Sequence, residues 1–122
     1  MTGRVEMLHE RDGETVILAP TGRLDSLTAP ALRAALATLD AAGERRIVVD
    51  LGGVPYISSA GLSVLFALAK RMREVGGMLA ICSLGDQVRR VFELAGYLQH
   101  FSVAPTRAEA VALAGGDAAR GR

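Results

Sequence analysis

The 122-residue chain contains no tryptophan, a single cysteine and two histidines. With one thiol, Cys82, it cannot form an internal disulfide, and the apolar run that ends at this residue favours an inert core position. His9 and His100 have no carboxylate or serine neighbour at an informative spacing. No Cys/His pattern with metal-ligand spacing occurs either, so we expect neither a metal site nor a cofactor.

The chain also lacks charge of one sign and long hydrophobic runs. Its 14 basic and 13 acidic residues leave a net charge of +1, whereas a nucleic-acid-binding surface would be strongly basic. No apolar stretch approaches the roughly 18 to 20 residues that span a bilayer, and the N-terminus has no signal-peptide core. We therefore expect a cytoplasmic protein that does not bind nucleic acid and does not insert into a membrane.

Motifs typical of enzymes and nucleotide-binding proteins are missing as well. Residues 52–55 (GGVP) do not continue into the Lys-Ser/Thr ending of a phosphate-binding loop, and no GxGxxG occurs. Residues 58–61 (SSAG) do not form the GxSxG turn of serine hydrolases. The pattern therefore predicts a binding or switching module and not an enzyme.

Hydrophobic patterning predicts one α/β domain with a small mixed sheet and helices packed on it. An Asp12-Gly13 turn joins the first two strands in a hairpin, and Pro20 is expected to end the second strand. The Gly-, Ala- and Arg-rich residues 115–122 are expected to form a disordered tail after a domain of residues 1–114. The predicted order is ββαβαβαβα, with strands at 5–9, 15–19, 47–51, 78–82 and 101–104 and helices at 28–42, 59–75, 83–96 and after Thr106.

The most informative segment is residues 48–66, where a buried strand enters a Gly/Pro loop, two serines follow and a helix begins. Free N–H groups and the helix dipole favour a negative group at such a helix start. Ser58 and Ser59 could therefore be helix caps, or one of them could be a phosphorylated serine. Capping accounts for one serine, but it does not explain the second serine or the glycine at position 61.

A helical projection of residues 59–75 separates a core stripe from an outward face. The outward face consists of small residues at one end, Ser59, Ser63 and Ala67, and charged residues at the other. Phe66 falls at the border between the two. Small residues would let a partner approach closely with Phe66 as an anchor; alternatively, this is a solvated helix face with Phe66 turned into the core. The predicted core stripe comprises Leu62, Leu65, Leu68, Ala69, Met72 and Val75.

Several segments together resemble the STAS domain, in particular the single-domain bacterial anti-sigma factor antagonists. The resemblance extends over residues 5–113. The matching segments are residues 21–25 (TGRLD), 47–51 (IVVDL), 56–62 (YISSAGL), 76–77 (GG) and 88–97 (VRRVFELAGY).

The resemblance implies a partner switch. Unphosphorylated antagonists bind a GHKL-type anti-sigma kinase, phosphorylation of a serine at the start of the second helix releases them, and a PP2C-type phosphatase reverses the modification. Ser59 matches the phosphorylated position. Ser58, the alternative acceptor, stands where antagonists often carry Asp, and Ala60 stands where they carry Ser or Thr. Asp25 matches an acidic loop position and is either a recognition residue or a turn residue.

Two other functions are compatible with these residues. STAS-like domains also act as accessory subunits of stress-signalling complexes or of lipid-transport ATPases without a phospho-switch, and the departures at Ser58 and Ala60 leave this alternative open. A nucleotide or small-molecule sensor is the other. Its support is the helix start as an anion site, and the scarcity of aromatic residues weighs against it.

Overall fold

The computed structural model describes residues 4–120, with side chains up to residue 115. The predicted order of strands and helices is confirmed, with a short 3-10 helix, η1, added before the last strand. The elements are β1 (Glu6–Asp12), β2 (Thr15–Thr21), α1 (Ala29–Ala41), β3 (Arg46–Asp50), α2 (Ser59–Glu74), β4 (Met78–Cys82), α3 (Asp86–Leu94), η1 (Leu98–His100), β5 (Ser102–Ala104) and α4 (Arg107–Arg120).

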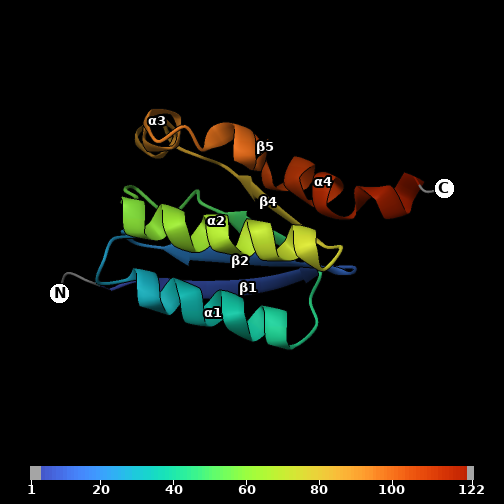
Figure 1. Ribbon diagram of the computed structural model, residues 1–122. Coiled ribbons are helices and arrows are strands. Elements are labelled where there is room, and N and C mark those ends of the chain that lie inside the picture. The colour runs from blue at the N-terminus through green and yellow to red at the C-terminus, as the bar shows by residue number, and fades with distance from the viewer. Residues whose placement is uncertain (1–3, 121–122) are drawn as a thin grey trace.

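The five strands form one mixed sheet in the order β1-β2-β3-β4-β5. β1 and β2 pair antiparallel, and all the later pairs are parallel. α1 and α2 lie side by side along one face of the sheet (Figure 1), where they share a core with α3, whereas α4 packs on β3, β4 and β5 from the other face. The predicted fold class is confirmed.

The central strands are buried on both faces. Ile47 and Val49 of β3 point into the core beneath α1, α2 and α3, and Val48 between them points into the smaller core beneath α4. A parallel strand covered on both sides needs a continuous apolar run. This is why the sequence of β3 shows no alternation.

Pro20 does not end β2, contrary to the expectation, because the strand continues to Thr21. Pro20 pairs with Met7 of β1, while the registered pairs between β2 and β3 stop at Leu18. A proline is tolerated where a strand has no hydrogen bond to lose on one side. The hairpin turn itself is confirmed, with Asp12 opposite Thr15 and Gly13 at a φ of 62°.

The start of α4 agrees with the expected cap. The Glu109 N–H donates to the Thr106 hydroxyl at 3.2 Å, and this hydroxyl donates to Oε1 of Glu109 at 3.1 Å. α4 runs to Arg120, and residues 121–122 lie outside the described part. The division into a domain of residues 1–114 and a tail of residues 115–122 stays a prediction. Within residues 4–120, no helix is both long and apolar enough to cross a bilayer.

Candidate functional site

The two serines at the start of α2 have different structural roles. Ser58 is the N-cap: its backbone is extended (φ −101°, ψ 176°), and its hydroxyl accepts a hydrogen bond from the Ala60 N–H at 3.2 Å. The Ser58 carbonyl accepts from the Leu62 N–H at 3.0 Å. The capping function therefore belongs to Ser58, which leaves Ser59 without this task.

Ser59 is the first residue of α2, and its side chain is exposed. Among the described residues, none forms a hydrogen bond with its hydroxyl. Modification of Ser59 would break no internal contact, and it would place a negative group at the positive end of a 16-residue helix. Ser59 therefore presents an accessible hydroxyl at the helix start, and its phosphorylation stays a prediction.

The cap assignment predicts that the two serines differ in their effect on stability. Ser58→Ala is expected to lower the free energy of unfolding by about 1 kcal/mol, because the Ala60 N–H loses its acceptor. The free energy of unfolding of Ser59→Ala is expected to stay within about 0.5 kcal/mol of the wild-type value, because Ser59 is exposed and its side chain does not cap the helix. Urea denaturation of both variants measures the difference, and equal stability would contradict the cap role.

The loop before α1 holds the start of α2 in place. Leu24 forms an isolated parallel bridge with Ile57, and the Ser58 N–H donates to the Leu24 carbonyl at 2.8 Å. Gly61 lies directly on this bridge: a Cβ at position 61 would be 2.9 Å from Cγ1 of Ile57 and 3.2 Å from Cβ of Leu24. Capping could not explain this glycine; close packing against the bridge does.

Asp25 has the turn role that the sequence left as one of two options. Its Oδ1 accepts hydrogen bonds from the N–H groups of Leu27 at 3.0 Å and Thr28 at 3.2 Å, at the entrance of α1. Desolvation alone would raise the pKa of Asp25, but these hydrogen bonds, the Thr28 hydroxyl and the charge of Arg23 hold this pKa below its ordinary value. The carboxylate therefore stays ionised at neutral pH. Its role in recognition remains a prediction.

The outward face of α2 agrees with the helical projection at its small residues. Ser63 and Ala67 are exposed, in line with Ser59. Phe66 is half-buried: its ring stacks on Tyr97 with centroids 5.2 Å apart and meets the edge of His100 at 5.8 Å. Phe66 thus shares its surface with η1 and the residue before it. That Phe66 anchors a partner stays a prediction.

The core side of α2 differs from the projection at two positions. Val64 is buried although it was not placed in the stripe, whereas Val75 is half-buried. α1 packs along the Val64 flank of α2, so the apolar surface is wider than one sheet-facing stripe.

The sequence gives no sign of a second anchor for the loop that carries the serines. Oδ1 of Asp50 accepts from the Gly52 N–H at 2.9 Å, and Oδ2 accepts from Nε of Arg107 at 2.8 Å. Arg107 also donates to Glu10 at 2.7 Å. These bonds tie the start of α4 to the loop between β3 and Ser58. Partial burial would raise the pKa of Asp50, but the hydrogen bonds from Gly52 and Arg107 outweigh it and lower the pKa.

This ion pair predicts a pH-dependent loss of stability. A carboxyl whose pKa is lowered by folding stabilises the native state above its unfolded pKa of about 3.9, and this contribution disappears as the pH falls through the lower native value. Arg107→Gln is expected to cost about 1 to 2 kcal/mol at pH 7. The difference in the free energy of unfolding between the variant and the wild type should be smaller at pH 3 than at pH 7. Urea titrations at both pH values test this, and a constant gap would contradict it.

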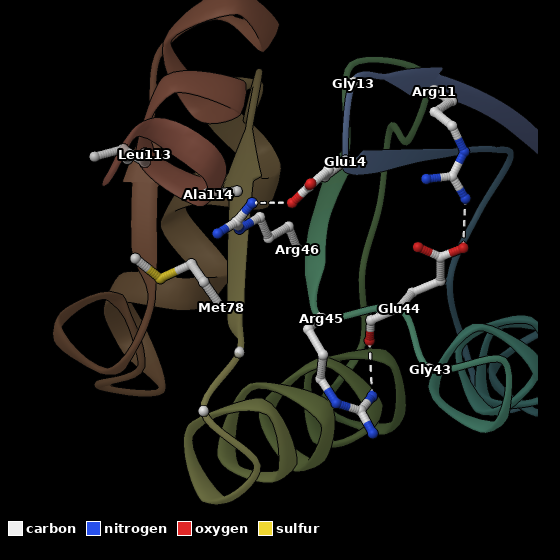
Figure 2. A pocket seen from close by; sticks show the side chains of 12 residues that line it. Arg11, Gly13, Glu14, Gly43, Glu44, Arg45, Arg46, Met78, Leu113 and Ala114 are labelled. Atoms are coloured by element: carbon white, nitrogen blue, oxygen red, sulfur yellow. Dashed lines mark hydrogen bonds and ion pairs between the residues drawn. The ribbon is translucent and has the colours of Figure 1, made fainter. Parts of the chain in front are cut away.

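A hollow with a volume of about 600 Å³ lies at the other end of the sheet. It is formed by the β1–β2 turn, the connections that lead into β3 and β4, and part of α4. Figure 2 shows that its arginines face neighbouring groups: Arg46 faces Glu14, Arg11 faces Glu44, and Arg45 donates to the Glu44 carbonyl. These cations are engaged within the hollow itself, and we assign no ligand to it.

Among the side chains that the structure describes, residues 4–115, no three of His, Cys, Asp or Glu lie together in a way that could hold a metal ion. The only described cysteine, Cys82, is buried at the end of β4, and burial raises the pKa of its thiol. The site around Ser59 therefore consists of an exposed hydroxyl at a helix start, beside a loop that carries the carboxylate of Asp25. This arrangement can accept a phosphate and present a surface to a protein.

Known proteins share this arrangement of elements. The sequence profile of the STAS domain family matches residues 6–110. The chain is 48% identical over 91 residues to a candidate anti-sigma factor antagonist, BtrV, of Bordetella bronchiseptica, covering 75% of this chain and 78% of that protein. It is 30% identical over 89 residues to the anti-sigma-B factor antagonist of Listeria monocytogenes, covering 73% and 78%. The crystal structure of an anti-sigma factor antagonist from Mycobacterium paratuberculosis superposes with a TM-score of 0.84 at 27% identity, covering 92% of this chain and 95% of that one.

Proposed function

Because the chain belongs to the STAS domain family, we propose that it is an anti-sigma factor antagonist whose binding is controlled by phosphorylation of Ser59. In the unphosphorylated state it binds a GHKL-type anti-sigma kinase. The kinase phosphorylates Ser59 and the complex dissociates; a PP2C-type phosphatase restores the binding state. The observation that carries this proposal is the division of roles at the start of α2, where Ser58 caps the helix and Ser59 is exposed.

The proposed docking surface is the α2 face, defined as Ser59, Ser63 and Ala67 with the borders formed by Asp25 and Phe66. Three small exposed residues at helical spacing let another backbone approach α2 closely. The loop that carries Asp25 is bonded to Ser58, so this carboxylate lies on the same end of the molecule. Ser58 is half-buried, and its hydroxyl is engaged in the helix cap. It therefore contributes to the docking surface mainly through its backbone and its position.

Phosphorylation would change binding more than folding. A phosphate adds about −1.5 to −2 charges at pH 7. The N-terminus of α2 stabilises such a charge by roughly 0.3 to 1 kcal/mol, so the domain tolerates it. A partner packed on the α2 face would have to desolvate the phosphate, which costs far more than that gain. The switch therefore acts at the interface and leaves the sheet and its helices in place.

The departure from the family pattern at Ser58 does not remove the helix cap. Ser58 replaces an aspartate, yet serine and aspartate are nearly equal as N-cap residues. The hydroxyl of Ser58 makes the hydrogen bond that an aspartate would make at this position. What the chain lacks is the negative charge of that aspartate.

The proposal is tested by capturing the tagged chain from its own cells with its partners and mapping phosphosites by mass spectrometry. A co-purifying GHKL-type kinase together with phosphate on Ser59 is the expected result. Incubation of the purified pair with ATP should then modify the wild type and Ser58→Ala but not Ser59→Ala. A transport-type ATPase as the partner, with both serines unmodified, would overturn the phospho-switch and favour an accessory subunit.

A further inference from the structure

A shallow groove runs between α1 and α2 next to the α2 face, with a volume of about 180 Å³. Its floor is apolar, because Leu36, Val64 and Leu68 are buried beneath it. Ala37 of α1 and Ala67 of α2 form its walls, and both are exposed. Short side chains on both helices leave this groove open, and we refer to it as the α1–α2 groove.

The rim of the groove is positively charged. At the far end, Asp40 accepts from Nη1 of Arg45 at 3.1 Å and from Nε of Arg71 at 3.0 Å, so two cations compensate its single charge. Arg33 is exposed on the rim, and among the described side chains of residues 4–115 it has no ion-pair or hydrogen-bond partner. The apolar floor is therefore bordered by guanidinium groups in excess of carboxylates.

This combination specifies the chemistry of an occupant. An apolar side chain would cover the floor, and carboxylates on either side of it would meet the arginines of the rim. A nucleic acid or an anionic membrane would need a much larger basic surface than a chain of net charge +1 presents. The occupant that fits is a protein segment with an apolar residue flanked by acidic residues.

We propose that the α1–α2 groove is part of the docking surface for the partner kinase and receives an acidic segment of it with an apolar anchor. The inference rests on the proposed function, and it extends the interface from α2 onto α1. Ala67 belongs to both the groove and the α2 face, so one partner can cover the two without a gap.

Two substitutions at one position test the charge of the occupant. Ala37→Glu and Ala37→Lys add side chains of similar length but of opposite charge, on α1 and outside the predicted phosphosite. Calorimetric titration with the purified GHKL-type kinase should show that the Glu variant binds on the order of tenfold more weakly than the Lys variant. Arg33→Glu should weaken binding by about the same factor. The control is Arg90→Glu, which makes the same charge change on the exposed face of α3.

The outcomes separate this inference from the function on which it rests. Equal affinities of the two Ala37 variants, whether reduced or unchanged, would overturn the acidic occupant. An Arg90→Glu effect as large as that of Arg33→Glu would do the same, since net charge alone would then account for the loss. If the wild-type chain itself does not bind the kinase, the proposed function fails and this inference falls with it. Thermal melts of each variant confirm that the fold is retained.

Discussion

Replacing Ser59 with glutamate is expected to weaken binding to the partner kinase by about 30-fold or more. A charge buried unpaired in an interface costs about 2 kcal/mol or more, and each 1.4 kcal/mol is a factor of ten in affinity. The fold should be retained, because an acidic residue in the first turn of a helix adds a few tenths of a kcal/mol to its stability. Calorimetric titration and thermal melting measure the two effects on the same samples.

The matched control for this variant is Ser59→Gln. Glutamine has the size and shape of glutamate without its charge, so it isolates the electrostatic part of the loss. The Gln variant is expected to bind more tightly than the Glu variant by about tenfold. If the two variants bind equally weakly, bulk at the exposed Ser59 position and not charge would be responsible. If both bind like the wild type, the partner does not contact the start of α2.

The second large effect is expected from Gly61→Val. The added side chain would collide with the Leu24–Ile57 bridge, where even a Cβ would lie 2.9 Å from Ile57 Cγ1. Overpacking of this kind costs about 1 to 3 kcal/mol of stability, and it displaces the start of the helix. Because Ser58 and Ser59 begin this helix, phosphorylation of Ser59 should slow as well. Urea denaturation and a phosphorylation time course measure both consequences.

Gly85→Val is the control for the glycine substitution. Gly85 has a φ of −72°, and nothing lies within 4 Å of the place where a Cβ would be built. Gly85 directly precedes α3, and Gly61 lies in the first turn of α2. Unlike Gly61, Gly85 has free space around it. A loss of stability in Gly85→Val as large as that in Gly61→Val would mean that the lost flexibility of glycine matters, and that the Leu24–Ile57 contact does not.

The sequence predicted those features of the fold that depend on local patterns. The position of α2 followed from apolar residues at three- and four-residue spacing, and the exposure of Ser63 and Ala67 followed from the same period. The buried strands followed from short apolar runs between turn signals. Pro20 was misplaced, because whether a proline ends a strand depends on how far the neighbouring strand extends, and no local pattern shows this.

The contacts that build the site join segments far apart in the chain and could not be predicted. Asp50 and Arg107 are 57 positions apart, and each is an ordinary charged residue in its own segment. Which of the two serines caps the helix depended on the backbone conformation of Ser58, because this conformation decides which hydroxyl reaches the N–H groups of the first turn. The sequence did not explain the glycine at position 61. The structure explains it by the close packing of Gly61 on the Leu24–Ile57 bridge.

In the proposed switch, phosphate on Ser59 turns binding off while the fold persists. The direct measurement is the affinity of the kinase for two preparations of the wild-type chain, one unmodified and one fully phosphorylated on Ser59, with thermal melts of both. We expect the phosphorylated chain to bind at least about 100-fold more weakly and to melt within a few degrees of the unmodified chain. Equal affinities, or a loss of binding that accompanies unfolding, would contradict it.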